Sequence, residues 1–166
     1  MDLPNIFKGQ QEKMHWGEAL GLWDICHFKV LGLTISEIFI AQAKDEDLKK
    51  SLSTGVEMLI IPHIEKIQKF MHKEGTKAPT VPSRKNLDII GKRAEPNSYI
   101  EDDEIANSIR EIYKFGLELG MRALTSSTRE DIQELIWDIL SDDVRGFKAM
   151  LKLHTKKNWL IPPQTI

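Results

Sequence analysis

The spacing of the helical segments constrains this chain more than any other feature of its sequence. Apolar residues recur at every third or fourth position, as in amphipathic helices, over the ranges of about 15–43, 46–73, 101–125 and 128–157. Very short connections join the first range to the second and the third to the fourth, so each pair must lie antiparallel. No stretch alternates apolar and polar residues as a half-buried strand does. The spacing therefore predicts an all-α protein built from two antiparallel helical hairpins.

A long segment, residues 75–99, connects the two predicted hairpins and contains three of the seven prolines. A helix of about 28 residues is about 42 Å long, whereas an extended segment of this size reaches roughly 80 Å. The connection can therefore cross the whole length of a helical bundle. Two hairpins joined by one long crossover form the ferritin-like arrangement of a four-helix bundle. We predict this fold, in a single domain covering residues 1–166, a length typical of one domain.

Charge and hydropathy argue against several kinds of partner. The formal net charge is only −2, so no overall positive field attracts nucleic acid or an anionic membrane surface. No window approaches the roughly 20 apolar residues of a membrane span, and the N-terminus lacks a basic segment followed by an apolar run. The single cysteine, Cys26, cannot form a disulfide within the chain. We therefore expect no nucleic acid and no membrane among the partners, and a cytoplasmic location.

The first helical range is predicted to bury one stripe along its length, which includes a histidine. The members of this stripe are Trp16, Leu20, Trp23, His27, Val30 or Leu31, Thr34, Ile38 and Ala41. Their spacing of three and four residues places them on one side of a helix. The same periodicity in the second range places His63 on an apolar face. Both histidines are therefore expected to face the interior.

A proline interrupts the second helical range, in the segment GVEMLIIPHIEKIQKFM at residues 55–71. Pro62 cannot donate a hydrogen bond to the carbonyl of Met58, and a proline inside a helix costs about 3 kcal/mol unless the helix bends. We therefore predict a kink at Pro62. Such a kink either opens a pocket beside His63 or wraps a long helix around the core.

Ferritin-like bundles often hold two metal ions, which suggests a test of the sequence. Two helices each supply one Glu, and the other two each supply a Glu-x-x-His pair. That pair is absent from the second, third and fourth helical ranges. It occurs only from Glu12 to His15 and, with Asp in place of Glu, from Asp24 to His27. The sequence therefore does not predict a di-metal centre.

A site for a single metal ion or a small ligand is the alternative. Imidazole is a common ligand of zinc and iron, so His27 and His63 are its first candidates, with the carboxylates of Asp24, Glu57 and Glu111 as partners for zinc, iron or manganese. In the other interpretation, each histidine packs in the core or at its rim and hydrogen-bonds to a neighbour. No catalytic motif is present. We therefore predict no catalytic residue, no required cofactor and no enzymatic activity.

Three segments of the chain resemble a known family. Residues 16–23 (WGEALGLW), 62–67 (PHIEKI) and 157–163 (KNWLIPP) are similar to segments of a ferritin-like family from endospore-forming bacteria, whose members are often labelled spore coat proteins. The resemblance extends over nearly the whole chain and implies the same bundle. It also implies a non-enzymatic protein that acts through protein–protein contacts, in the cytoplasm of the producing cell or in the spore coat, with other coat proteins as partners.

The chain departs from this family in three places. His15 stands where members usually have a Ser or Thr N-cap, so the first turn of the helix is expected to fray or to begin earlier. Asn158 stands in place of a Gly after the last helix, a position that either residue can occupy in a left-handed conformation. Members commonly carry two bundles in tandem, whereas this chain has one. We therefore expect a homodimer whose interface replaces the second bundle.

Overall fold

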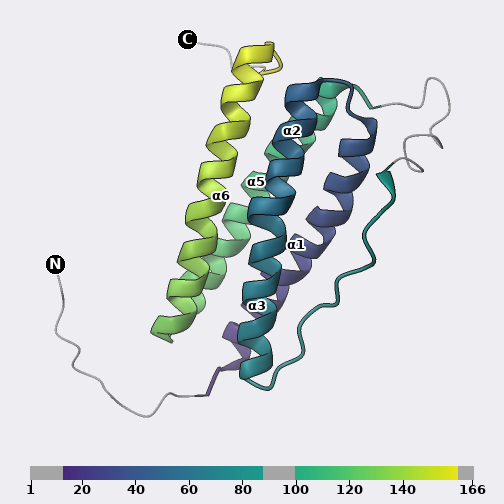
Figure 1. Cartoon of the computed structure of the whole chain (residues 1–166). Coiled ribbons are helices and arrows are strands. Elements are labelled where there is room, and N and C mark those ends of the chain that lie inside the picture. The colour runs from purple at the N-terminus through teal and green to yellow at the C-terminus, as the bar shows by residue number, and fades with distance from the viewer. Residues whose placement is uncertain (1–12, 88–99, 161–166) are drawn as a thin grey trace, which may run out of the picture.

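The computed structural model describes residues 13–87 and 100–160, which form a bundle of long, roughly parallel rods (Figure 1). The helices are α1 Trp16–Gln42, α2 Glu46–Gly55, the π-helical turn η1 Val56–Ile60, α3 Ile61–Lys73, α5 Asp102–Ser126 and α6 Glu130–Lys157. Because α2, η1 and α3 follow one another without a break, they make one rod. The described residues are therefore an all-α, ferritin-like four-helix bundle without strands. The helix bounds lie within two residues of the predicted ranges.

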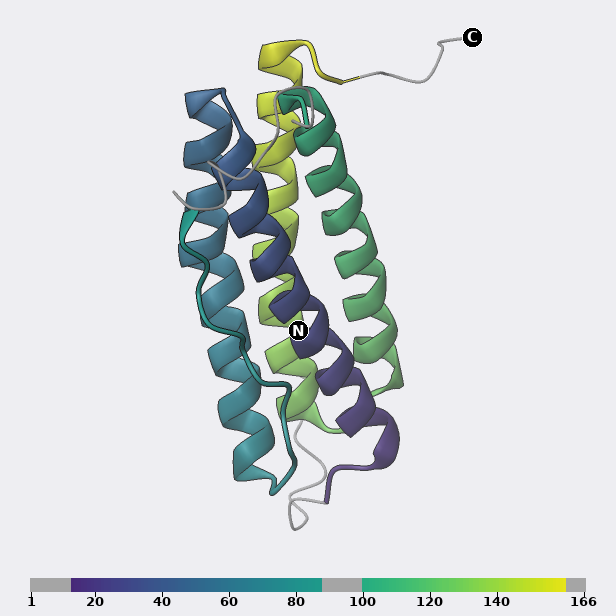
Figure 2. The ribbon, with the colours of Figure 1, turned by 90° about the vertical axis from the view of Figure 1, so that its right-hand side faces the viewer.

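A crossing segment connects the two hairpins. Gly75, with φ of 73°, ends α3, and residues 76–87 then run back along the bundle beside α3 and α1 (Figure 2). Two contacts fix this course: the Gln68 side chain donates to the carbonyl of Pro79 at 2.8 Å, and the amide of Lys85 donates to the Glu37 carboxylate at 3.0 Å. The remainder of the predicted crossover, residues 88–99, lies outside the described residues.

The ends of the helices are capped by side chains that the sequence only partly indicated. The imidazole Nδ1 of His15 accepts hydrogen bonds from the amides of Gly17 and Glu18, at 3.0 and 3.3 Å, and the Glu18 carboxylate accepts from the amide of His15 at 3.0 Å. The expectation of a frayed or earlier start is therefore wrong, because this imidazole caps as a hydroxyl would. At the other end of the chain, Asn158 is left-handed, with φ of 59° and ψ of 32°, as predicted.

The orientation of α1 differs from the prediction. The buried residues of α1 are Glu18, Leu22, Ile25, Cys26, Lys29, Val30, Gly32, Leu33, Ser36 and Glu37. The predicted stripe lies largely on the outside, with Trp16 91% and Leu20 59% exposed. The reason is that apolar residues surround the axis of α1, so that their periodicity does not select one face. The charged residues that would normally mark the outer face are instead buried and paired.

A π-helical turn takes the place of a simple kink near Pro62. In η1 the chain widens, and the amide of Ile61 donates to the carbonyl of Val56, five residues earlier. Pro62 follows within the first turn of α3, where a missing N–H is best tolerated. The predicted irregularity is thus present, and it places His63 on the buried side of α3, with 1% of its surface exposed.

No helix in the described part of the chain is both long enough and apolar enough to cross a membrane.

Candidate functional site: a buried charged network beside a cavity

Charged and polar side chains from three helices meet inside the bundle. The ammonium of Lys29, on α1, donates to both carboxylate oxygens of Asp143, on α6, at 2.6 and 2.7 Å. His63, on α3, hydrogen-bonds through Nε2 to Oδ2 of Asp142 at 3.1 Å. Its other ring nitrogen, Nδ1, lies 3.7 Å from Oδ1 of Asp143. We call these four residues the buried network.

The charges of the buried network are matched. Lys29, Asp143 and His63 are all buried, and an isolated charge there would be strongly destabilising. The two-oxygen contact between Lys29 and Asp143 neutralises both groups. Asp142 lies nearer the surface and also binds the Arg145 side chain. The network therefore carries no net unpaired charge when His63 is neutral.

Burial keeps His63 neutral at physiological pH. Burial, followed by the nearby positive charge of Lys29, holds the pKa of His63 below its usual value, although the hydrogen bond to Asp142 opposes this. That hydrogen bond also holds the pKa of the Asp142 carboxyl below its usual range. A carboxylate only accepts, so Nε2 of a neutral His63 carries the proton and Nδ1 has a free lone pair. Nδ1 is buried and has no hydrogen-bond partner among the described residues.

A cavity of about 60 Å³, partly open to solvent, lies next to the pair formed by Lys29 and Asp143. Its walls come from α1, α2, η1, α5 and α6 and are mostly apolar, with three hydroxyl groups among them. The polar lining residues besides Lys29 and Asp143 are Ser36, Ser51 and Tyr113. The cavity and the buried network thus share two residues and form one continuous interior region.

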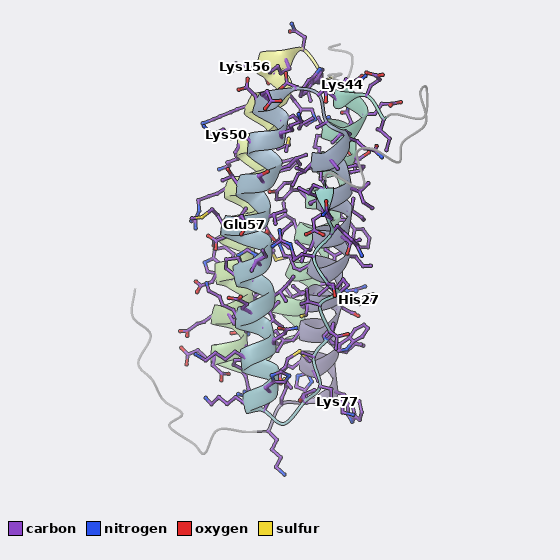
Figure 3. All side chains as sticks on the ribbon, turned by 45° about the vertical axis from the view of Figure 1, so that its right-hand side comes forward. His27, Lys44, Lys50, Glu57, Lys77 and Lys156 are labelled. Atoms are coloured by element: carbon purple, nitrogen blue, oxygen red, sulfur yellow. The ribbon has the colours of Figure 1, made fainter. Side chains whose placement is uncertain are left out.

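The residues predicted to bind a metal or ligand are not brought together. His27 is exposed and stacks on Trp23, with ring centroids 4.8 Å apart. Glu57 is exposed on η1 and binds Arg84 at 3.2 Å; Figure 3 labels it and His27 on different helices. The exposed Glu111 binds Lys114 at 2.7 Å, and the partly buried Asp24 lies 3.9 Å from Arg122. Of the five candidates, only His63 lies in the buried network.

The donor set does not fit the metal centre that a ferritin-like fold suggests. No group of three or more His, Cys, Asp or Glu side chains in residues 13–87 and 100–160 is arranged to hold a metal ion. The ammonium of Lys29 already occupies both oxygens of Asp143, the most deeply buried carboxylate near His63. We therefore derive no metal-dependent step for this interior.

Sequence reasoning missed Lys29 and Asp143, although their spacing carried a signal. Lys29 follows Leu22 by seven residues and Ile25 by four, which places it on the buried face of α1. Asp143 has the same relation to Ile136 and Ile139 on α6. A lysine and an aspartate at core positions of different helices are candidates for a buried pair, because neither is stable in the interior alone.

Comparison with known proteins places the chain among proteins without an established function. The family model described as "Protein of unknown function (DUF3231)" matches residues 4–166. The chain is 28% identical over 159 residues to the uncharacterized protein YvdQ of Bacillus subtilis strain 168, covering 93% of this chain and 89% of that protein. The match extends over almost the full length of both chains, so it concerns the whole bundle.

Solved structures show the same fold at low sequence identity. A Bacillus halodurans protein described as a "putative spore coat protein" is 24% identical, with a TM-score of 0.85 over 93% of this chain and 96% of that chain. A two-domain protein of Anabaena variabilis, with DJ-1/ThiJ/PfpI-like and ferritin-like domains, has a TM-score of 0.70 and 15% identity, covering all of this chain and 48% of that one. A conserved hypothetical protein of Mycobacterium tuberculosis has a TM-score of 0.67 and 8% identity, over 84% and 98% of the two chains. These similarities establish the fold.

Proposed function

Because this chain belongs to the DUF3231 family of proteins of unknown function, we propose its role from its own surface: it is a spore-coat-associated protein that acts through protein–protein contacts and catalyses no reaction. Its first partner is a second copy of itself, and other coat proteins are further partners. The observation that supports this role is the apolar outer side of α1. The spore association is supported by the structurally similar Bacillus halodurans protein, which is described as a spore coat protein.

An apolar strip runs along the solvent side of α1, which we call the α1 outer face. It consists of Trp16, Leu20, Trp23, His27 and Leu31. Trp23 is 38% exposed and Leu31 is 48% exposed, and Trp16 and Leu20 are more exposed than either. These residues extend over 16 positions, from Trp16 to Leu31, or about 22 Å of helix. In Figure 2, α1 faces the viewer and no other described helix covers this side.

Neighbouring residues of α5 extend the apolar area. Phe115 is 58% exposed and contacts Phe28 of α1, with ring centroids 5.4 Å apart. Met121, on the same helix, is also exposed. Contiguous exposed apolar surface with aromatic residues is typical of protein interfaces, because such residues gain most from burial against a partner. The α1 outer face is therefore the surface through which we expect the chain to associate.

The oligomeric state in solution tests the self-association. We expect the wild type to sediment as a dimer at micromolar concentration, and the double variant Trp23→Glu with Leu31→Glu to sediment as a monomer. Trp137→Glu is the matched control, because Trp137 is a comparably exposed tryptophan on α6, and it should leave the dimer intact. A monomeric wild type, or a dimer lost only in the Trp137 variant, would overturn the proposed interface.

The spore association is tested separately in a sporulating Bacillus host. A fluorescent fusion of the wild type should form a ring at the spore surface, and the double α1 variant should stay diffuse in the mother cell. A wild-type fusion that stays diffuse would contradict the coat association without affecting the dimer.

A further inference from the structure

We infer that the cavity beside Lys29 and Asp143 is a binding site for a small, uncharged organic molecule with an apolar body and one hydroxyl or carbonyl group. The inference is independent of the proposed contacts on α1, which involve the other side of that helix. It rests on unfilled space beside a buried glycine, on hydroxyl groups around that space that do not bond to the protein, and on the charge balance of its walls.

A buried glycine keeps the cavity open. Gly32 lies in the middle of α1, where glycine costs about 1 kcal/mol relative to alanine. A Cβ atom added to Gly32 would meet no other atom within 4 Å, so the space beside it is empty. Gly55 and Gly116 line the same cavity from α2 and α5. Protein interiors are normally closely packed, so a gap left at a buried glycine needs a reason.

The π-helical turn forms another part of the wall. Leu59 and Ile60 of η1 line the cavity. Single π-turns are rare and occur frequently at functional sites, because the widened turn displaces side chains from their regular positions. The irregularity at η1, together with Pro62 after it, therefore shapes the site as well as the helix.

Three hydroxyl groups face this space without partners. Ser36, Ser51 and Tyr113 line the cavity, and none of their hydroxyl groups makes a hydrogen bond to another group in the described part of the chain. Ser36 is buried and Ser51 and Tyr113 are partly buried. None of the three oxygen atoms is fully buried, so each hydroxyl can bond to water or to an occupant of the cavity. Burial, with a contribution from Asp143, raises the pKa of Tyr113 to about 12, so its hydroxyl keeps its proton and can donate.

The charges in the wall select a neutral occupant. Lys29 and Asp143 are bound to each other through both carboxylate oxygens, so neither is free to pair with a charged ligand. A ligand that entered with its own charge would lose its hydration without gaining a counter-charge. A hydroxyl or carbonyl group, in contrast, can pair with the free hydroxyls. The volume is several times the roughly 10–15 Å³ that one water requires, so a short carbon chain can enter.

The experiment compares three probes with the same apolar body: 1-butanol, butyrate and butylammonium. Each is titrated into ¹⁵N-labelled full-length protein, and amide shifts are followed by NMR. We expect saturable millimolar binding of 1-butanol, with shifts confined to the amides of the cavity walls, and no saturable binding of the two ions. If butyrate or butylammonium bound as tightly as 1-butanol, the inference that the occupant is uncharged would be overturned. No saturable binding of 1-butanol would mean that the cavity holds ordered water only, and would overturn the site.

Variants at the cavity wall provide the controls. Gly32→Leu should fill the space, abolish 1-butanol binding and raise the melting temperature, whereas Ala149→Leu, on the exposed side of α6, should leave binding unchanged. Gly32→Ala, a smaller change, should weaken binding and keeps the test valid if the leucine variant does not fold. Tyr113→Phe should lower the affinity for 1-butanol about three- to tenfold, because it removes one hydrogen bond. Unchanged binding in both Gly32 variants would place the alcohol elsewhere and contradict the inference.

Discussion

Helices α1 and α5 pack against each other in the same bundle, yet they use charge in opposite ways. The buried residues of α5 are Ile105, Ala106, Ile109, Gly120 and Ala123, none of which is charged. The buried residues of α1 include Glu18, Lys29 and Glu37, while its tryptophans lie outside. α5 therefore follows the usual pattern of an amphipathic helix, and α1 reverses it. The difference shows that the buried face of a helix is decided by the partners available to its side chains as well as by their hydropathy.

Each buried charge of α1 has partners from a distant part of the chain. The Glu18 carboxylate accepts hydrogen bonds from the amides of Thr128 and Arg129, at 2.8 and 3.0 Å, and so anchors the turn that leads into α6. Glu37 holds the crossing segment through Lys85 and the Arg84 side chain. α5, in contrast, begins with a local capping box, in which Glu104 accepts from the amide of Glu101 at 2.9 Å. The buried charges of α1 thus join distant elements. The charged groups of α5 are not buried, and Glu104 acts within its own helix, although Asp102 at the start of α5 accepts from the amides of Lys44 and Asp45 at 2.8 and 3.0 Å.

The largest expected effect is the loss of the positive charge inside α1. Lys29→Met leaves the carboxylate of Asp143 buried without its counter-charge, so we expect the free energy of unfolding to fall by about 3–5 kcal/mol. Urea denaturation followed by circular dichroism measures it. The double variant Lys29→Met with Asp143→Leu removes both charges and should recover most of this loss. If the double variant is no more stable than the single one, the pair is not the source of the effect.

Removing the Glu18 carboxylate of α1, which anchors the turn before α6, should have the second largest effect. Glu18→Ala leaves the amides of Thr128, Arg129 and His15 without their acceptor, so we expect a loss of about 2–3 kcal/mol in urea denaturation.

The matched control for Glu18 is Glu104→Ala, which removes the exposed local cap of α5 and should cost less than about 1 kcal/mol. Equal losses in the two variants would remove the distinction between the helices.

A titration of stability against pH tests the role of Glu18 in a second way. Burial alone would raise the pKa of the Glu18 carboxyl. The hydrogen bonds from the amides of Arg129, Thr128 and His15 lower this pKa by a larger amount, so it lies below its usual value. The contribution of Glu18 to the free energy of unfolding is therefore complete at neutral pH and is lost as the pH falls below about 4.

A smaller effect is expected from His63, which faces the buried charges of α1 and α6. Its folded pKa is depressed, so the folded state favours the neutral ring, and stability is complete above the usual value near 6.5. Stability should therefore fall as the pH decreases below 6.5, by no more than about 1.4 kcal/mol per pH unit. Urea denaturation from pH 8 to pH 5 measures this slope. His63→Gln should remove it, whereas the exposed control His72→Gln should not; a slope that persists in His63→Gln would assign it to another group.

The helices and their connections could be predicted because their signals are local. Short turns, capping residues and three-to-four periodicity are read within one segment, and for α3 the periodicity also placed His63 on the buried face. For α1 it could not, since apolar residues surround the axis. The buried network could not be assembled from the sequence either, because Lys29 and Asp143 are 114 residues apart, and the spacing within one helix does not identify a partner on another. His63 was predicted to face inward, but its partners became visible only in the folded bundle.

The smallest expected effect concerns the surface charges of α5. Glu111 is exposed and binds Arg110 and Lys114 on its own helix, and these contacts, led by the hydrogen bond from Lys114, hold its pKa below the usual range. In water such pairs gain little, because solvent screens the attraction and ordering the side chains opposes it. Glu111→Ala should therefore leave the urea midpoint unchanged within error, at low salt as well as high. A clear fall in the urea midpoint at low salt that disappears at high salt would show that the surface charges of α5 also stabilise the bundle. Helices α1 and α5 would then differ only in how much their charges contribute to stability.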